Sequence, residues 1–129
     1  NYVKRVIGLP GDYVEVKEGI VYINDEPLDE DYVYYEGGSV DLRGDFEKTL
    51  VPADSYFVMG DNRNNSKDSR FWTTTHFVTK EAILGKAIFS YYPSVYILNW
   101  FTEIFFFTNN LKATADIKVV GFFIFFCNM

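Results

Sequence analysis

Residues 60–70 read Gly-Asp-Asn-Arg-Asn-Asn-Ser-Lys-Asp-Ser-Arg, and mainly apolar stretches flank them at residues 55–59 and 71–72. A polar run of this length after a strand-like segment is typical of a solvated loop. The run contains two acids, two arginines, three asparagines and two serines, enough for hydrogen bonds and ion pairs within the loop itself. The sequence therefore predicts a strand that leads into a loop whose polar groups satisfy one another.

A second informative stretch opens the chain, where residues 2–12 read Tyr-Val-Lys-Arg-Val-Ile-Gly-Leu-Pro-Gly-Asp. Its first six residues are typical of a strand, since β-branched and aromatic side chains favour that conformation. Alternation along a strand places Lys4 on one face with Tyr2 and Val6, and Arg5 on the opposite face. Lys4 is therefore expected among apolar side chains, with the charge of Arg5 pointing away from it.

Several more short strands are indicated, with turn residues between them. The expected strands are residues 13–17, 20–23, 56–59 and 86–92, and the expected turns are residues 8–12, 24–25 and 52–54. Residues 79–85 are expected to form one short helical turn, capped by Thr79 and ended by Gly85. Short strands at this spacing predict a mainly β fold with an antiparallel β-sheet.

Composition narrows the classes of function. A chain of 129 residues suits a single domain with one modest core. The net charge is −6 and half of the acids lie in residues 25–47, which argues against a nucleic-acid partner. The only cysteine, Cys127, permits no intrachain disulfide, and the only histidine, His76, has no metal-ligand spacing around it. The apolar stretches at residues 104–107 and 119–127 are shorter than the roughly 20 residues that span a bilayer.

Neither of these two stretches fits a metal-binding or phosphate-binding motif. An EF-hand loop counted from Asp61 would have Arg63, Ser66 and Trp72 at its third, sixth and twelfth positions, where a ligand, glycine and glutamate are needed. Residues 8–11 lack the Gly-Lys-Ser/Thr ending of a phosphate-binding loop. We therefore expect no metal and no cofactor.

Together and in this order, the two stretches resemble characteristic blocks of the bacterial type I signal peptidases, membrane-anchored serine proteases that use a Ser/Lys dyad. The resemblance covers about residues 2–98. It implies that residues 1–98 are the C-terminal part of an antiparallel β catalytic domain, incomplete at its N-terminus, with a small β insertion at about residues 20–52. Residues 99–129 form an aromatic-rich tail outside the resemblance, and we assign it no function.

The resemblance also implies roles for individual residues. It identifies Lys4 as the general base and Ser66 as the hydroxyl that orients its amine, through a hydrogen bond of roughly 2.6–3.2 Å. Asp68 is expected to pair with Arg5 on the back of the strand or with Arg70, because a carboxylate touching the amine of Lys4 would keep that amine protonated. The expected supporting residues are Arg5, Gly60, Asp61, Asn62, Arg63, Asp68, Ser69 and Arg70.

A lysine can take a proton from serine only when its amine is neutral. An ordinary lysine has a pKa of about 10.4 and is charged at neutral pH. Burial among apolar groups lowers that pKa, because desolvation disfavours the ammonium form. The apolar neighbours expected for Lys4 fit this requirement.

The implied function is an endopeptidase that removes signal peptides from secretory precursors with small residues at −1 and −3. Its substrate is expected to lie as an extended strand against the sheet edge near Lys4. In the family the serine precedes the lysine, after a transmembrane anchor that holds the enzyme in the cell membrane with its catalytic domain on the extracytoplasmic side. The chain begins at Asn1, so we expect a fragment with the base but without the nucleophile, inactive by itself. The alternatives are a self-cleaving Ser/Lys peptidase of the repressor type and a non-catalytic aromatic-rich β domain that binds peptide or glycan.

Overall fold

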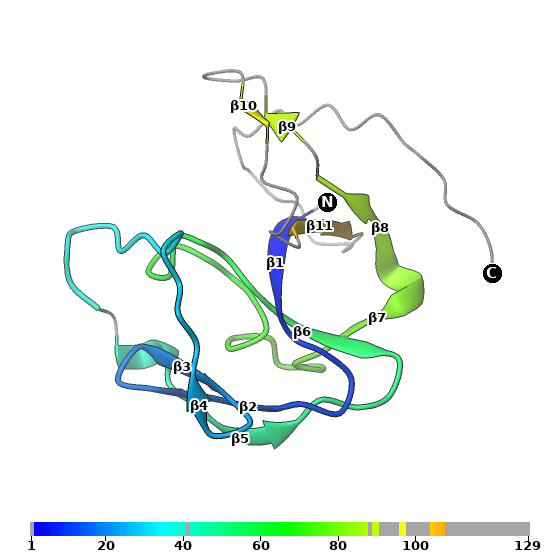
Figure 1. Ribbon diagram of the computed structural model, residues 1–129, viewed down its shortest axis with the longest axis horizontal. Coiled ribbons are helices and arrows are strands. Elements are labelled where there is room, and N and C mark those ends of the chain that lie inside the picture. Colours follow the sequence, from blue (N-terminus) through cyan, green and yellow to red (C-terminus); the bar gives the residue numbers. More distant parts are fainter. Residues whose placement is uncertain (1, 41, 88, 91–95, 98–103, 108–129) are drawn as a thin grey trace.

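Antiparallel strands dominate the chain (Figure 1). The computed structural model describes residues 2–40, 42–87, 89–90, 96–97 and 104–107. The strands are β1 (Tyr2–Gly8), β2 (Tyr13–Lys17), β3 (Ile20–Ile23), β4 (Glu26–Pro27), β5 (Phe46–Leu50), β6 (Ser55–Met59), β7 (Val78–Thr79), β8 (Ile83–Lys86), β9 (Phe89–Ser90), β10 (Tyr96–Ile97) and β11 (Ile104–Phe107). Two short 3₁₀ turns accompany them, η1 (Leu42–Gly44) and η2 (Lys80–Ala82). The mainly β, antiparallel fold expected from the sequence is confirmed.

Two sheets carry most of these strands. One has the order β7-β6-β1-β11-β8 and the other the order β4-β3-β2-β5, while β9 and β10 form a separate pair. Figure 1 shows β2 to β5 gathered at one end of β1, whereas β11 and β8 lie at its other end. The tip between β3 and β4 has positive φ angles at Asn24 and Asp25, residues that tolerate this conformation. The turn expected at residues 24–25 is therefore confirmed.

The main core lies where strands of the two sheets meet. Its buried members come from β1, β2, β3 and β6 and from the residue after β5: Ile7, Val14, Val16, Val21, Val51, Phe57 and Met59. Phe57 is fully buried, and its ring centroid lies 4.8 Å from that of Phe46. Because β1 and β6 both contribute to this core, the chain entering β1 and the loop leaving β6 are anchored to the same packed unit.

Gly8 ends β1 at a point where the chain passes very close to this core. A Cβ atom there would overlap Val14 Cγ2 and lie 3.1 Å from Val51 Cγ2. We expect Gly8→Ala to lower the free energy of unfolding of the chain by about 1–3 kcal/mol, because overpacking forces neighbouring groups apart. Urea unfolding measures the loss. The matched control is Gly85→Ala in β8, where the described part of the chain places no atom within 4 Å of the added methyl. Equal losses at the two positions would contradict the packing argument.

Some expected elements differ from the structure. The helical turn expected over residues 79–85 is confined to η2, and Ile83 already begins β8, which pairs with β11. Tertiary pairing thus overrides the local helical preference. The strand expected over residues 86–92 is divided between β8 and β9, and residues 88 and 91–95 lie outside the described residues.

The aromatic run at residues 104–107, to which the sequence assigned no element, is strand β11 and pairs with both β1 and β8. Cys127 and the rest of the tail lie outside the described residues. Within the described part of the chain, no helix has the length and apolar character needed to cross a membrane.

Candidate active site

Lys4 lies in the middle of the larger sheet, on a strand with neighbours on both sides. In the pairing of β1 with β11, Lys4 stands opposite Phe105, and β6 pairs with β1 from Arg5 onward. The side chain of Lys4 is half-buried, and its Nζ lies 5.6 Å from the centroid of the Tyr2 ring. Burial lowers the pKa of Lys4 from its ordinary value of 10.5. The apolar setting expected for this lysine is therefore present on its own face of the strand.

Charges around Lys4 act on its pKa in both directions. After burial, the largest influences are Asp68, which raises the pKa, Arg70, which lowers it, and Asp61, which raises it. Among the described residues, no carboxylate forms an ion pair with Lys4, because these acids are paired with arginines. The amine therefore sits near charges that partly cancel, and burial decides the direction.

Gly60 brings Lys4 and Ser66 to the same point. A Cβ atom at Gly60 would overlap Ser66 Oγ and lie 3.5 Å from Lys4 Nζ. The absence of a side chain at Gly60 therefore leaves the space in which the hydroxyl and the amine converge. This convergence of strand β1 with the loop after β6 agrees with the arrangement expected from the sequence.

The hydrogen bond expected between Lys4 and Ser66 is not formed. Ser66 Oγ is buried and has no hydrogen-bond partner in the described part of the chain. The expectation was wrong in this detail, because facing positions fix the approach of two side chains but not the rotamers that complete a bond. An unpartnered buried hydroxyl is costly to maintain, and this one lies at the point where the amine of Lys4 approaches Gly60.

Asp61 is the acid that pairs with Arg5. Arg5 Nε donates to Asp61 Oδ1 at 2.9 Å, and Arg5 Nη2 donates to Asp61 Oδ2 at 2.7 Å. The expected pair of Asp68 with Arg5 is thus wrong. The physical reason is position, since Asp61 lies two residues after the end of β6, the strand that pairs with β1 at Arg5. This two-bond contact fixes the start of the polar loop to the strand that carries Lys4.

Asp68 pairs with Arg70, the second partner that the sequence allowed. Arg70 Nε and Nη2 each donate to Asp68 at 2.9 Å, and the Asp68 carboxylate also accepts from the backbone N–H of Gly60 at 3.0 Å. Asp68 is fully buried. Ser69, also fully buried, accepts a hydrogen bond from the backbone N–H of Val58 at 2.9 Å. The end of the loop is thereby fastened to its beginning and to β6.

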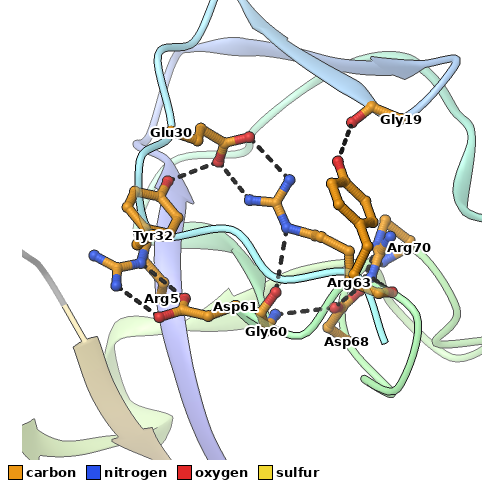
Figure 2. Close-up of polar contacts among 10 residues, drawn as sticks. Arg5, Gly19, Glu30, Tyr32, Gly60, Asp61, Arg63, Asp68 and Arg70 are labelled. Carbon is orange, nitrogen blue, oxygen red and sulfur yellow. Dashed lines mark hydrogen bonds and ion pairs between the residues drawn. The ribbon is translucent and has the colours of Figure 1, made fainter. Parts of the chain in front are cut away.

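Arg63 is buried and finds its acid in a distant segment. Its guanidinium donates through Nη1 and Nη2 to the two carboxylate oxygens of Glu30, and its Nε donates to the carbonyl oxygen of Gly60 at 3.2 Å. Glu30 also accepts from the hydroxyl of Tyr32 at 2.6 Å. Figure 2 shows Glu30 between Tyr32 and Arg63, with Arg5 and Asp61 on the other side of the Tyr32 ring.

Glu30 and Tyr32 are site-associated residues that the sequence did not indicate. They lie in the irregular segment after β4, where acids are frequent and no spacing distinguishes one from another. The signal available was that a buried arginine needs an acid. That rule gives no means of choosing among the nine acids of residues 25–47.

Asn62 and His76 also form contacts that help to hold the loop of residues 60–70. Asn62 Nδ2 donates to Glu36 at 3.2 Å, and Asn62 Oδ1 accepts from the backbone N–H of Asn65 at 3.2 Å. His76, expected to be a loop residue and not a ligand, places its Nδ1 2.6 Å from the carbonyl oxygen of Ser69. The loop of residues 60–70 is therefore held by its own groups and by side chains from outside it.

Comparisons with known proteins agree on one family. Residues 1–92 match the family model described as signal peptidase, peptidase S26. A probable signal peptidase I-2 of Synechocystis sp. is 46% identical over 96 residues, covering 71% of this chain and 38% of that protein. Signal peptidase I S of Bacillus subtilis is 46% identical over 99 residues, covering 72% of this chain and 53% of that protein.

Among solved structures, a signal peptidase I from Enterococcus faecalis V583 is similar, with a TM-score of 0.49 and 36% identity. The match covers 60% of this chain and 74% of that one. The chain spans only 38% to 53% of the length of the two curated relatives named above.

Proposed function

The chain belongs to the signal peptidase, peptidase S26, family, and from this premise we propose that its whole protein is a membrane-bound serine endopeptidase. The proposed reaction is the removal of signal peptides from secreted precursor proteins, with small residues at −1 and −3 of the substrate. In it Lys4 is the general base that activates a serine contributed by another part of the protein. We further propose that this protein works in the cell membrane with its catalytic domain on the extracytoplasmic side.

The single observation that best supports the proposal is the setting of the Lys4 amine. It is half-buried, it has a lowered pKa, and in the described part of the chain no acid pairs with it. A structural lysine gains from an acid partner, whereas a base must be able to lose its proton. Ser66 beside it would orient the amine once a hydroxyl nucleophile completes the site.

The sheet edge beside Lys4 limits how a substrate can bind. The sequence favours an extended substrate added to this edge, but β11 pairs with β1 over Tyr2 to Arg5. At Lys4, β11 therefore occupies one edge of β1, and on the other edge the pairing with β6 begins at Arg5. An extended substrate on the β11 side of Lys4 would take the place of β11, since one strand edge accommodates one partner at a time.

The pH dependence of cleavage tests the proposal. We expect kcat/KM of the complete protein to rise with pH and to level off above the pKa of Lys4, because only the neutral amine accepts a proton. Since burial lowers that pKa, the midpoint should lie below 10.5. The measurement uses a peptide with Ala at −1 and −3 and identifies the cleaved bond by mass spectrometry. Failure to cleave after the −1 residue at every pH would reject the proposed function, and a midpoint at or above 10.5 would reject Lys4 as its buried base.

A further inference from the structure

The segment that carries Glu30 and Tyr32 lies along the polar loop of residues 60–65. The backbone N–H of Tyr34 donates to the carbonyl oxygen of Asp61 at 2.8 Å, and the N–H of Arg63 donates to the carbonyl oxygen of Tyr34 at 2.9 Å. These bonds form a parallel bridge between Tyr34 and Asn62. The segment between β4 and η1 is thus attached to the loop through backbone as well as side chains.

Each of three arginines, one in β1 and two in the polar loop, has its own acid. Arg5 pairs with Asp61 and Arg70 pairs with Asp68, so both of these acids belong to the polar loop. The third pair joins Arg63 to Glu30, 33 residues away in the sequence, with side chains 3% and 9% exposed. Glu30 is therefore the one acid of the three that comes from outside the two motifs.

The Glu30–Arg63 pair holds Gly60, the residue beside which Lys4 and Ser66 converge. Arg63 donates through Nε to the carbonyl oxygen of Gly60, while Asp68 accepts from the N–H of the same residue. Hydrogen bonds therefore hold both the carbonyl oxygen and the N–H of Gly60. The side of Gly60 where a Cβ atom would stand faces Lys4 Nζ and Ser66 Oγ. If Arg63 loses its acid, a buried cation is left without a partner and its hold on Gly60 weakens.

Tyr32 links this pair to the strand that carries Lys4. Its hydroxyl donates to Glu30, and the guanidinium of Arg5 lies 3.5 Å from the centroid of its ring. Burial and the Glu30 carboxylate raise the pKa of Tyr32 above its ordinary value, so the phenol stays protonated and remains a donor. Arg5 is the residue directly after Lys4 on β1. Tyr32 therefore contacts both Glu30, the acid that pairs with Arg63, and Arg5, the neighbour of Lys4 on β1 (Figure 2).

We propose that Glu30 and Tyr32 are positioning residues of the peptidase, which hold Gly60 and Arg5 and thereby fix the amine of Lys4 in its buried place. This inference rests on the proposed function and adds to it that the segment between β4 and η1 completes the catalytic site. In this role the segment acts through Arg63 and Arg5.

The test uses the complete protein with Glu30→Gln, which keeps the shape of the side chain and removes its charge. We expect kcat to fall by about tenfold to a hundredfold with KM within about twofold of wild type, as for a misplaced catalytic group. The midpoint of the pH profile should move upward, because a loosened Lys4 gains contact with water and loses part of its desolvation. A purely structural role would lower the melting temperature without moving that midpoint.

Tyr32 gives a second variant that keeps the ion pair. Tyr32→Phe removes the hydrogen bond to Glu30 and keeps the ring under Arg5, so we expect a fall in kcat of about twofold to tenfold. Tyr32→Leu also removes the stacked ring and should be more severe. Asp31→Asn and Tyr34→Phe are matched controls at exposed positions of the same segment, and both should retain wild-type kcat and midpoint.

The outcomes separate this inference from the proposed function. If wild type does not cleave, the proposed function fails, and NMR titration of the Lys4 amine in wild type and Glu30→Gln still measures the upward shift. If Glu30→Gln does not fold, Tyr32→Phe and Tyr32→Leu decide. Variants at Glu30 and Tyr32 that fold, retain at least half of the wild-type kcat and keep the same midpoint would overturn the inference.

Discussion

Replacing Lys4 by arginine is expected to abolish precursor cleavage by the complete protein, with a loss of at least about 10²- to 10⁴-fold in kcat/KM. Arginine keeps the positive charge and approximate length, but its guanidinium is not deprotonated in proteins and cannot accept the serine proton. The half-buried setting of Lys4 would remain occupied by a cation. The measurement is the rate of cleavage of a peptide with Ala at −1 and −3, at a pH where wild type has reached its plateau.

The matched control for this variant is Lys67→Arg. Lys67 lies in the polar loop of residues 60–70, and its side chain is exposed, so its replacement should leave the rate unchanged. Circular dichroism of both variants checks that they remain folded. Cleavage by Lys4→Arg at a rate near wild type would show that Lys4 is not the base, and the proposed function would have to be abandoned with it.

The sequence predicted the parts of the fold that depend on local pattern. Strand alternation predicted that Lys4 shares a face with Tyr2, whereas Arg5 lies on the opposite face. Both Lys4 and Arg5 lie on the predicted faces. It could not predict β11, because a run of consecutive aromatic residues has no period of two to distinguish a strand. The position of that strand depends on long-range pairing with β1 and β8.

The same limit applies within the site. The need for a neutral amine excluded Lys4 as the partner of Asp68, but the sequence could not choose between Asp61 and Asp68 for Arg5. That choice depends on the register of β1 against β6, which only the folded chain defines. The contact of Glu30 with Arg63 could not be predicted for a related reason, because it joins an irregular segment to a loop.

The second large effect is expected at Asp68, whose carboxylate is fully buried and accepts from Arg70 and from the N–H of Gly60. Asp68→Asn preserves the shape but leaves Arg70 as a buried cation without its acid. Removing one partner of a buried ion pair costs about 3–5 kcal/mol, so we expect a loss of that size in the free energy of unfolding. Urea unfolding of the complete protein measures it.

Asp25→Asn is the matched control for this loss. Asp25 pairs with Lys48 at the surface, where solvent screens the interaction, and asparagine tolerates its positive φ of 73°. The control should therefore be far less destabilising than Asp68→Asn. Comparable losses at the two positions would mean that burial of the Asp68–Arg70 pair is not what makes it important.

Asp68→Asn should also change the titration of Lys4, and in the direction opposite to Glu30→Gln. Asp68 has the largest raising influence on the pKa of Lys4, so removing its negative charge lowers that pKa further, with only Asp61 still raising it. In the folded fraction, the midpoint of the pH profile should therefore move to lower pH. Glu30 is absent from the charges that act on Lys4, so its removal works through position alone. Midpoints that move in the same direction in both variants would show that the two acids do not differ in this way.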